Sequence, residues 1–281
     1  MASYARPSSI EETLSLLKRD SWRIVAGGTD FYPMQGDKPI RENVLDVSDL
    51  RDLREISVES DHWRIGGLAS WTDVIRHDLP PAFDGLKLAA REVGSIQIQN
   101  AGTVAGNLCN ASPAADSVPP LLTLDASVEL SSQDGRRTLP LGEFITGVRR
   151  TAMRPDEIVS AVLIPRAGDD APGHFIKLGA RVYLVISIVM VAAIVEPAGD
   201  GTVSRARVAV GSCSPVAQRL PALETALAGA PFEAAALAEI VRPEHFSVLS
   251  PIDDVRASAG YRLEAAEEMT RRVLKACAGG K

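Results

Sequence analysis

Residues 97–116 (QIQNAGTVAGNLCNASPAAD) have the composition of a segment that approaches a ligand. Gly102 and Gly106 lack side chains at a four-residue spacing, so the backbone can turn tightly and point its N–H groups outward. Alanines keep the surface low, and the short polar side chains of Asn, Thr, Ser and Asp suit an oxygen-rich, anionic ligand. The same residue types build ordinary surface loops, so composition leaves both ligand binding and a plain loop open.

A second glycine turn lies at residues 26–30 (AGGTD), directly after an expected strand at residues 23–26. A turn of this kind leaves backbone N–H groups free at the end of a strand, where a phosphate group could bind. A plain connection between a strand and a helix is the alternative, and the turn by itself does not decide between them.

Other patterns that carry chemistry are missing from the sequence. Cys109, Cys213 and Cys277 are far apart and form no CxxC pair, so we expect small packed thiols and no metal bound by this chain. The four histidines are scattered, and no HExxH or GxSxG motif accompanies them. The sequence therefore gives no basis for hydrolysis or metal catalysis.

Composition limits the possible partners and compartments. The chain has 281 residues, 46% hydrophobic content and a net charge of −6, which predicts a multi-domain globular protein that does not bind nucleic acid. The N-terminus has no signal-peptide pattern, so the cytoplasm is the expected location. The apolar run at residues 182–195 is shorter than the ~20 residues needed to cross a bilayer, so we expect no membrane insertion.

The elements that must position the glycine segments follow from apolar spacing. Ser9 with Glu11 and Glu12 predicts a capped first helix running to Leu17. We expect a second unit to begin near residue 56. The expected strands lie at 23–26, 44–47, from 63, 126–131 and 158–164, and the expected helices at 72–77 and 86–93. Residues 165–173, rich in Pro, Gly and Asp, are the best candidate linker.

Beyond that linker the composition becomes more apolar. Residues 182–195 predict a buried strand or a pair of strands, followed by a turn at 197–202 and a partner strand at 204–210. Alanine-rich windows at 223–227, 233–241 and 257–276 have helical spacing. The last third should therefore be a small sheet covered by helices.

With these motifs placed, the chain resembles the FAD-binding medium subunits of the molybdenum hydroxylases, which include xanthine dehydrogenase, carbon monoxide dehydrogenase and N-heterocycle dehydrogenases. The resemblance rests on segments in order over nearly the whole chain: AGGTD (26–30), IGGLASWTDV (65–74), IQNAGTVAGNLCNASPAAD (98–116), LLTLDASVEL (121–130), GVRRTAMRPDEIVSAVLIP (147–165) and FIKLGARVYLVISIVMVAAIV (175–195).

The resemblance implies an α+β fold: a two-subdomain PCMH-type FAD-binding domain, with the cofactor between its subdomains, followed by a small antiparallel sheet plus helical C-terminal domain. The implied boundaries are residues 1–56 and 57–173 for the FAD-binding subdomains and 174–281 for the third domain, whose sheet should have three strands.

The resemblance also implies a binding site without catalytic side chains. The FAD pyrophosphate should lie on two glycine loops, made of Ile24, Val25, Ala26, Gly27, Gly28, Thr29, Asp30 and Phe31, and of Thr103, Val104, Ala105, Gly106 and Asn107. The remaining expected binding residues are Val93 and Ile98 near the ring system, Ser112, Ala115, Asp116 on the flavin side, Ile158 or Val159, Lys177 and Tyr183. Lys177 could instead be a solvated strand residue, and an aliphatic neighbour could replace Tyr183 as the shield of the flavin face. Because Thr29 stands where a histidyl linkage would need histidine, the FAD should be non-covalent.

The implied function is electron exit from a larger complex. FAD would collect electrons from a small subunit with [2Fe–2S] clusters, while a large molybdopterin subunit oxidises the substrate, in a dimer of heterotrimers. A stand-alone flavin oxidoreductase and a flavin-free assembly subunit are the alternatives. The substrate (carbon monoxide, a purine, an aldehyde or an N-heteroaromatic compound) and the electron acceptor stay open.

Overall fold

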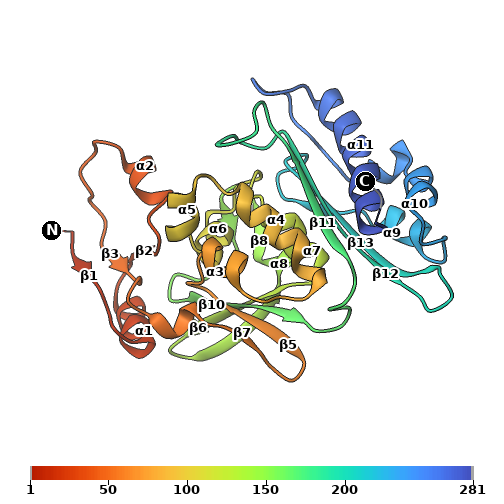
Figure 1. The fold of residues 1–281 in the computed structure, drawn as a ribbon. Coiled ribbons are helices and arrows are strands. Elements are labelled where there is room, and N and C mark those ends of the chain that lie inside the picture. The colour runs from red at the N-terminus through yellow and green to blue at the C-terminus, as the bar shows by residue number, and fades with distance from the viewer. Residues whose placement is uncertain (1, 280–281) are drawn as a thin grey trace. The chain divides into compact units, whose positions relative to one another are not determined.

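The computed structural model describes residues 2–279 and contains two compact units that interleave along the chain (Figure 1). The first unit consists of the chain up to His77, Ile96–Ala111 and Ala126–Pro165. The second consists of Asp78–Ser95, Ser112–Asp125 and the chain from Arg166. These units follow packing, and the domain boundaries expected from the sequence stay a prediction.

The first unit begins with a small parallel sheet in the order β1-β3-β2. Its elements are β1 (Tyr4–Ala5), α1 (Ile10–Arg19), β2 (Arg23–Val25), α2 (Phe31–Gln35) and β3 (Val44–Asp46). The hydroxyl of Ser9 accepts a hydrogen bond from the Glu12 N–H, as the predicted helix cap requires. Acidic residues in the first turn of α1 and basic residues in the last complement its dipole.

The larger sheet of this unit has five antiparallel strands in the order β4-β5-β10-β6-β7. Its strands are β4 (Ile56–Val58), β5 (His62–Gly66), β6 (Ser127–Ser132), β7 (Gly135–Pro140) and β10 (Ile158–Pro165). The other elements are η1 (Arg51–Arg54), α3 (Trp71–Arg76), α5 (Ile96–Ala101), α6 (Val104–Asn110), α8 (Leu141–Phe144), β8 (Ile145–Gly147) and β9 (Arg150–Thr151).

The second unit is built on an antiparallel sheet in the order β11-β12-β13-β14. Its strands are β11 (Gly173–Leu178), β12 (Val189–Pro197), β13 (Val203–Gly211) and β14 (Gln218–Arg219), so a two-residue strand joins the expected three. Its helices are η2 (Pro81–Phe83), α4 (Asp84–Glu92), α7 (Val118–Thr123), α9 (Pro221–Leu227), α10 (Ala234–Ile240), η3 (Pro243–Phe246) and α11 (Ala259–Cys277).

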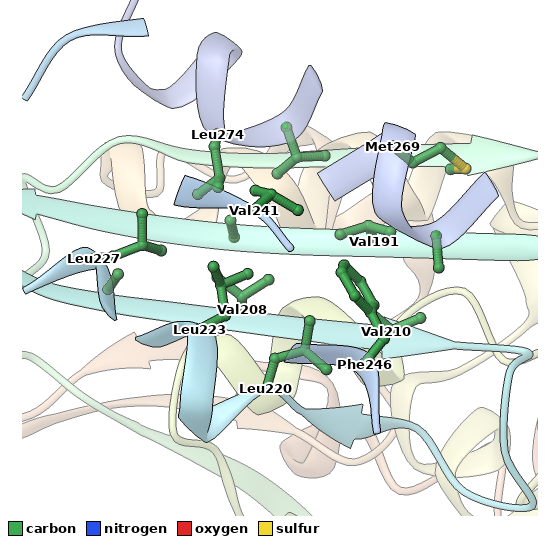
Figure 2. Close-up of a cluster of buried hydrophobic side chains, with 14 of the residues drawn as sticks. Val191, Val208, Val210, Leu220, Leu223, Leu227, Val241, Phe246, Met269 and Leu274 are labelled. Carbon is green, nitrogen blue, oxygen red and sulfur yellow. The ribbon is translucent and has the colours of Figure 1, made fainter. Parts of the chain in front are cut away.

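Both faces of β12 are buried, which explains its unbroken apolar sequence. Alternate residues such as Val189 and Val191 belong to a core formed with α9, α10 and α11. Figure 2 shows side chains of β12, β13, α9 and α11 gathered in this core. The intervening Met190 and Ala192 pack with Phe175 of β11 and with α4. Helices from before and after the linker therefore cover opposite faces of one sheet.

The prediction for residues 182–195 is correct only in its second half. Strand β12 begins at Val189, and the preceding residues form an exposed connection from β11. Val182 and Tyr183 are 72% and 71% exposed, and Leu184 has a positive φ of 52°, which a regular strand does not allow. No helix within residues 2–279 is long and apolar enough to cross a membrane.

Candidate functional site

The first group of predicted binding residues lies in the first unit, at the turn after β2. Gly28 has a φ of 68°, a conformation that glycine adopts at little cost. Gly27 is needed for a different reason: a Cβ at this position would lie 1.8 Å from the carbonyl oxygen of Ala101. The turn at residues 26–30 therefore packs directly against the end of α5, so the two glycine segments meet as expected.

The backbone N–H groups of this turn have no hydrogen-bond acceptor among the described residues. Within residues 2–279, the N–H groups of Gly27, Gly28, Thr29, Asp30 and Phe31 donate no hydrogen bond to another residue. Consecutive N–H groups of this kind are donors that can bind an anion. The turn therefore has the donors that a phosphate group needs.

The second predicted loop is in fact the first turn of α6. Thr103 is its N-cap residue, and its hydroxyl accepts a hydrogen bond from the Gly106 N–H at 3.0 Å. The N–H groups of Val104 and Ala105 donate to the carbonyl groups of Ala69 and Gly67, and the Asn107 N–H donates to the Thr103 carbonyl. This segment therefore offers fewer backbone donors to an anion than a free loop would, and its N–H at Thr103 is the one with no partner within residues 2–279.

The apolar binding residues predicted in the first unit differ in exposure. Ile158 and Val159 are 4% and 2% exposed, and Ile158 packs in the core beside α1 and β3. The Val159 carbonyl group would lie 2.3 Å from a Cβ on Gly67. Ile98 is half-buried, and its carbonyl accepts from the Gly102 N–H. Of these three side chains, that of Ile98 is the one that remains accessible.

The second group lies in the second unit and centres on Asp116. The Lys177 Nζ atom donates to Asp116 Oδ2 at 2.7 Å, and the Ser187 hydroxyl donates to Asp116 Oδ1 at 2.6 Å. The Lys177 side chain is 6% exposed, so the alternative that it is a solvated strand residue is wrong. Its ammonium group also donates to the carbonyl of Glu92 at the C-terminal end of α4, where the helix dipole favours a cation.

Burial controls the protonation of Asp116. Removal from water raises the pKa of its carboxyl group above the usual value, because the charged form loses hydration. The Lys177 ammonium and the Ser187 hydroxyl oppose this shift by stabilising the carboxylate. The three side chains form a compact polar cluster within an apolar surrounding.

The other residues predicted in this unit lie around the cluster or above it. Val93 is the half-buried residue that ends α4. The Ser112 hydroxyl accepts from the Ala114 N–H, and Ala115 is 3% exposed. Tyr183 lies in the exposed connection between β11 and β12. Ser112 is half-buried and its hydroxyl can still donate a hydrogen bond, whereas Ala115 could contribute to binding only through its backbone.

Two residues with important contacts were not predicted from the sequence. Ser187 is the only polar side chain in the run from Val182 to Val195, and that interruption of an apolar run was an available signal. Ala101 contributes its carbonyl oxygen to the contact with Gly27, and nothing in the sequence marks a backbone contact of this kind.

The cysteines provide no reactive thiol. Burial raises the pKa values of Cys109, Cys213 and Cys277 to about 12, so each thiol stays protonated at neutral pH. Within residues 2–279, no group of three or more His, Cys, Asp or Glu side chains is arranged to hold a metal ion.

Known proteins resemble the chain over its full length. Residues 1–167 match the FAD binding domain in molybdopterin dehydrogenase, and residues 174–277 match the CO dehydrogenase flavoprotein C-terminal domain. The xanthine dehydrogenase FAD-binding subunit of Escherichia coli O157:H7 is 30% identical, with 100% of this chain and 98% of that protein covered. The nicotinate dehydrogenase FAD-subunit of Eubacterium barkeri is 37% identical over 65% of this chain and 64% of its own length.

A solved structure of carbon monoxide dehydrogenase from Hydrogenophaga pseudoflava, in a form that lacks the Mo-pyranopterin moiety of its cofactor, has the same fold. One of its chains superimposes with a TM-score of 0.86 at 27% identity, covering 98% of this chain and 96% of that one.

Proposed function

This chain belongs to the family of FAD-binding subunits of the xanthine and carbon monoxide dehydrogenases, and we propose that it passes electrons from a partner subunit's [2Fe–2S] clusters through FAD to an external acceptor. The observation that carries the proposal is the turn at residues 26–31, in a segment that matches an FAD-binding family. Its consecutive N–H groups follow a strand and have no hydrogen-bond partner among the described residues 2–279.

The chain's residues fit the phosphate end of such a cofactor. A pyrophosphate carries two negative charges. The N–H groups of Gly27 to Phe31 would stabilise these charges by hydrogen bonding, without a lysine or a magnesium ion. Glycine at residues 27 and 28 permits this turn, because a Cβ on Gly27 would meet the Ala101 carbonyl oxygen and Gly28 has a positive φ. Thr103 would add its N–H group from the start of α6.

The predicted roles of Asp116, Lys177 and Tyr183 in holding the cofactor are part of the same proposal. The Lys177 ammonium is paired with the Asp116 carboxylate, so the two buried charges compensate each other. When bound, FAD supplies one-electron and two-electron redox chemistry, while the protein supplies position and electrostatic environment. No side chain of this chain needs to act as a nucleophile or general base.

We further propose that the chain assembles with a large molybdopterin subunit and a small [2Fe–2S] subunit, and that two such heterotrimers pair. Support comes from relatives that are named as medium chains, medium subunits or FAD-binding subunits and that this chain matches over nearly its whole length. Non-covalent attachment of the flavin is part of the same proposal, because Thr29 offers no group for a histidyl bond.

The flavin proposal is tested by denaturing the purified chain, alone or with co-expressed partners, and measuring the flavin released. We expect about one FAD per chain in the soluble fraction, and a well-folded, flavin-free preparation that does not take up added FAD would contradict the proposal. Turnover of a reduced substrate by the isolated chain would instead support a stand-alone oxidoreductase, whereas an electron-exit subunit should be inactive without its partners.

A further inference from the structure

The connection between β11 and β12, residues 179–188, presents apolar side chains to solvent. Val182, Tyr183, Leu184 and Ile186 are each more than half exposed. Its fold is nevertheless specific: Leu184 adopts a φ of 52°, and the Arg181 guanidinium donates two hydrogen bonds to the Leu184 carbonyl. A leucine in this backbone region is held there against a steric cost, so its surroundings must impose the conformation.

Both ends of this connection are attached to the same carboxylate. Lys177 lies near the end of β11, just before the connection, and its ammonium group donates to one oxygen of Asp116. Ser187 lies near the other end of the connection, and its hydroxyl donates to the second oxygen. The Ile188 N–H then bonds to the Leu178 carbonyl at 2.7 Å. Arg262 of α11 adds a bond to the Ile188 carbonyl. The ends are therefore fixed within the buried part of the unit, and only residues 181–186 project from it.

We infer that Asp116 is a positioning residue that clamps both ends of the connection at residues 179–188, and thereby holds the exposed side chains of Val182, Tyr183, Leu184 and Ile186 in one arrangement. This inference does not depend on flavin binding, because the hydrogen bonds that support it join residues of this chain to one another. Each oxygen of the Asp116 carboxylate accepts a hydrogen bond from one end of the connection, as the clamp requires.

The chemistry of the cluster makes Asp116 difficult to replace. Loss of its charge leaves the Lys177 ammonium buried without a counter-ion, which is far more costly than loss of an exposed ion pair. Asparagine keeps one acceptor oxygen for the Lys177 ammonium but has no negative charge, and its NH2 group can only donate, so the hydrogen bond from the Ser187 hydroxyl must reverse. An Asp116→Asn chain should therefore release at least one end of the connection.

Limited trypsin digestion of the purified full-length chain measures this release. The Arg181–Val182 bond lies in the connection, and cleavage there requires several residues to leave the folded surface. We expect Asp116→Asn to speed cleavage at this bond by about tenfold or more, which corresponds to ~1.4 kcal/mol. Cleavage at other Arg and Lys residues should stay unchanged. Asp200→Asn is the matched control, because Asp200 accepts from the N–H and the hydroxyl of Thr202 in the turn at the opposite end of β12.

A second pair of variants addresses the possibility that Asp116→Asn does not fold. Ser187→Ala removes one hydroxyl and leaves the ion pair intact, so a smaller acceleration at Arg181–Val182 is expected. Ser204→Ala is its control, because Ser204 is exposed on β13 and its hydroxyl donates to the Glu196 carbonyl.

A spectroscopic measurement separates positioning from general destabilisation. In a chain labelled with 3-fluorotyrosine, each of the four tyrosines gives one ¹⁹F NMR signal, and a Tyr183→Phe chain assigns that of Tyr183. In Asp116→Asn or Ser187→Ala, we expect the Tyr183 signal to shift and narrow while those of Tyr4, Tyr32 and Tyr261 stay in place. An unchanged Tyr183 signal with unchanged cleavage at Arg181 in both variants would overturn the inference.

The outcome is independent of flavin binding, because digestion and NMR are performed with and without added FAD. If the wild-type chain binds no FAD but the variants release the connection, the proposed function fails and the clamp stands. If Asp116→Asn loses FAD while the connection stays protected, Asp116 is a ligand contact and the clamp is wrong.

Discussion

The carbonyl oxygen of Ala101 lies 1.8 Å from the point where a Cβ atom on Gly27 would stand. This distance is far inside van der Waals contact, and the obstacle is backbone, which cannot rotate away as a side chain can. The contact joins the turn after β2 to the end of α5 and makes glycine obligatory at residue 27.

Gly27→Ala should therefore destabilise the protein by about 2 kcal/mol or more, because one of the two segments must move to accommodate the methyl group. Urea unfolding followed by circular dichroism measures the change. Gly260→Ala is the matched control: its Cβ meets nothing within 4 Å in the first turn of α11, so this change should be neutral or slightly stabilising. Equal stability of the two variants would refute the close contact.

Thr29→Asp should weaken FAD binding by about tenfold or more, equivalent to ~1.4 kcal/mol. The new carboxylate would repel the phosphates and would itself accept the N–H groups of the turn. Thr29→Asn has nearly the same shape without the charge and should keep its affinity within about threefold. The dissociation constant is measured by titrating FAD into the flavin-depleted chain, and similar weakening in both variants would show that charge at this turn is irrelevant.

Thr103→Ala should destabilise the chain by about 1 kcal/mol, because the Gly106 N–H loses the hydroxyl that caps α6. Thr103→Ser retains the hydroxyl and should cost much less, as measured by denaturant unfolding.

The same contact restricts substitution at residue 106. A Cβ on Gly106 would lie 2.8 Å from Thr103 Oγ1, so Gly106→Val would disturb the cap whether or not FAD is bound.

Asp254 should make the protein sensitive to acid. Hydrogen bonds from the Arg256 N–H, and then from the Arg256 and Arg262 guanidinium groups, lower the pKa of its carboxyl group to about 2. Because the folded-state pKa lies below the unfolded value, the stabilisation is complete above pH ~4 and is lost as the pH falls toward 2. The difference in thermal midpoint between wild type and Asp254→Asn should accordingly shrink over that interval. A constant difference from pH 5 to 2.5 would contradict this assignment.

Local features of the fold were predictable because their causes are local. The Ser9 cap depends on residues three positions apart, and the turn after β2 is marked by two adjacent glycines. The sequence identified Asp116 and Lys177 as candidate binding residues, but it did not identify Ser187 or the contact that joins the three side chains. Lys177 and Ser187 are separated from Asp116 by 61 and 71 residues in sequence, so no spacing rule reveals that one carboxylate joins them.

Two expectations failed because composition does not specify environment. The glycine and asparagine in residues 103–107 suggested a loop, but the Thr103 cap and the contacts to Gly67 and Ala69 stabilise a helical turn. Residues 182–186 are as apolar as β12, yet most of their side chains are exposed to solvent, and the positive φ of Leu184 breaks the extended conformation before β12 begins. Apolar content predicts that burial would be favourable, not that a partner surface is present.

Helix α4 packs on the sheet that begins at β11, although about eighty residues separate them in the sequence. On the ribosome, α4 must therefore wait until β11 and β12 have been synthesised before its apolar face is covered. Conversely, a fragment starting at residue 174 would expose Phe175, Met190 and Ala192 along one side of its sheet. A fragment cut at the linker would lack the residues that cover this face of its sheet, and we expect it to aggregate.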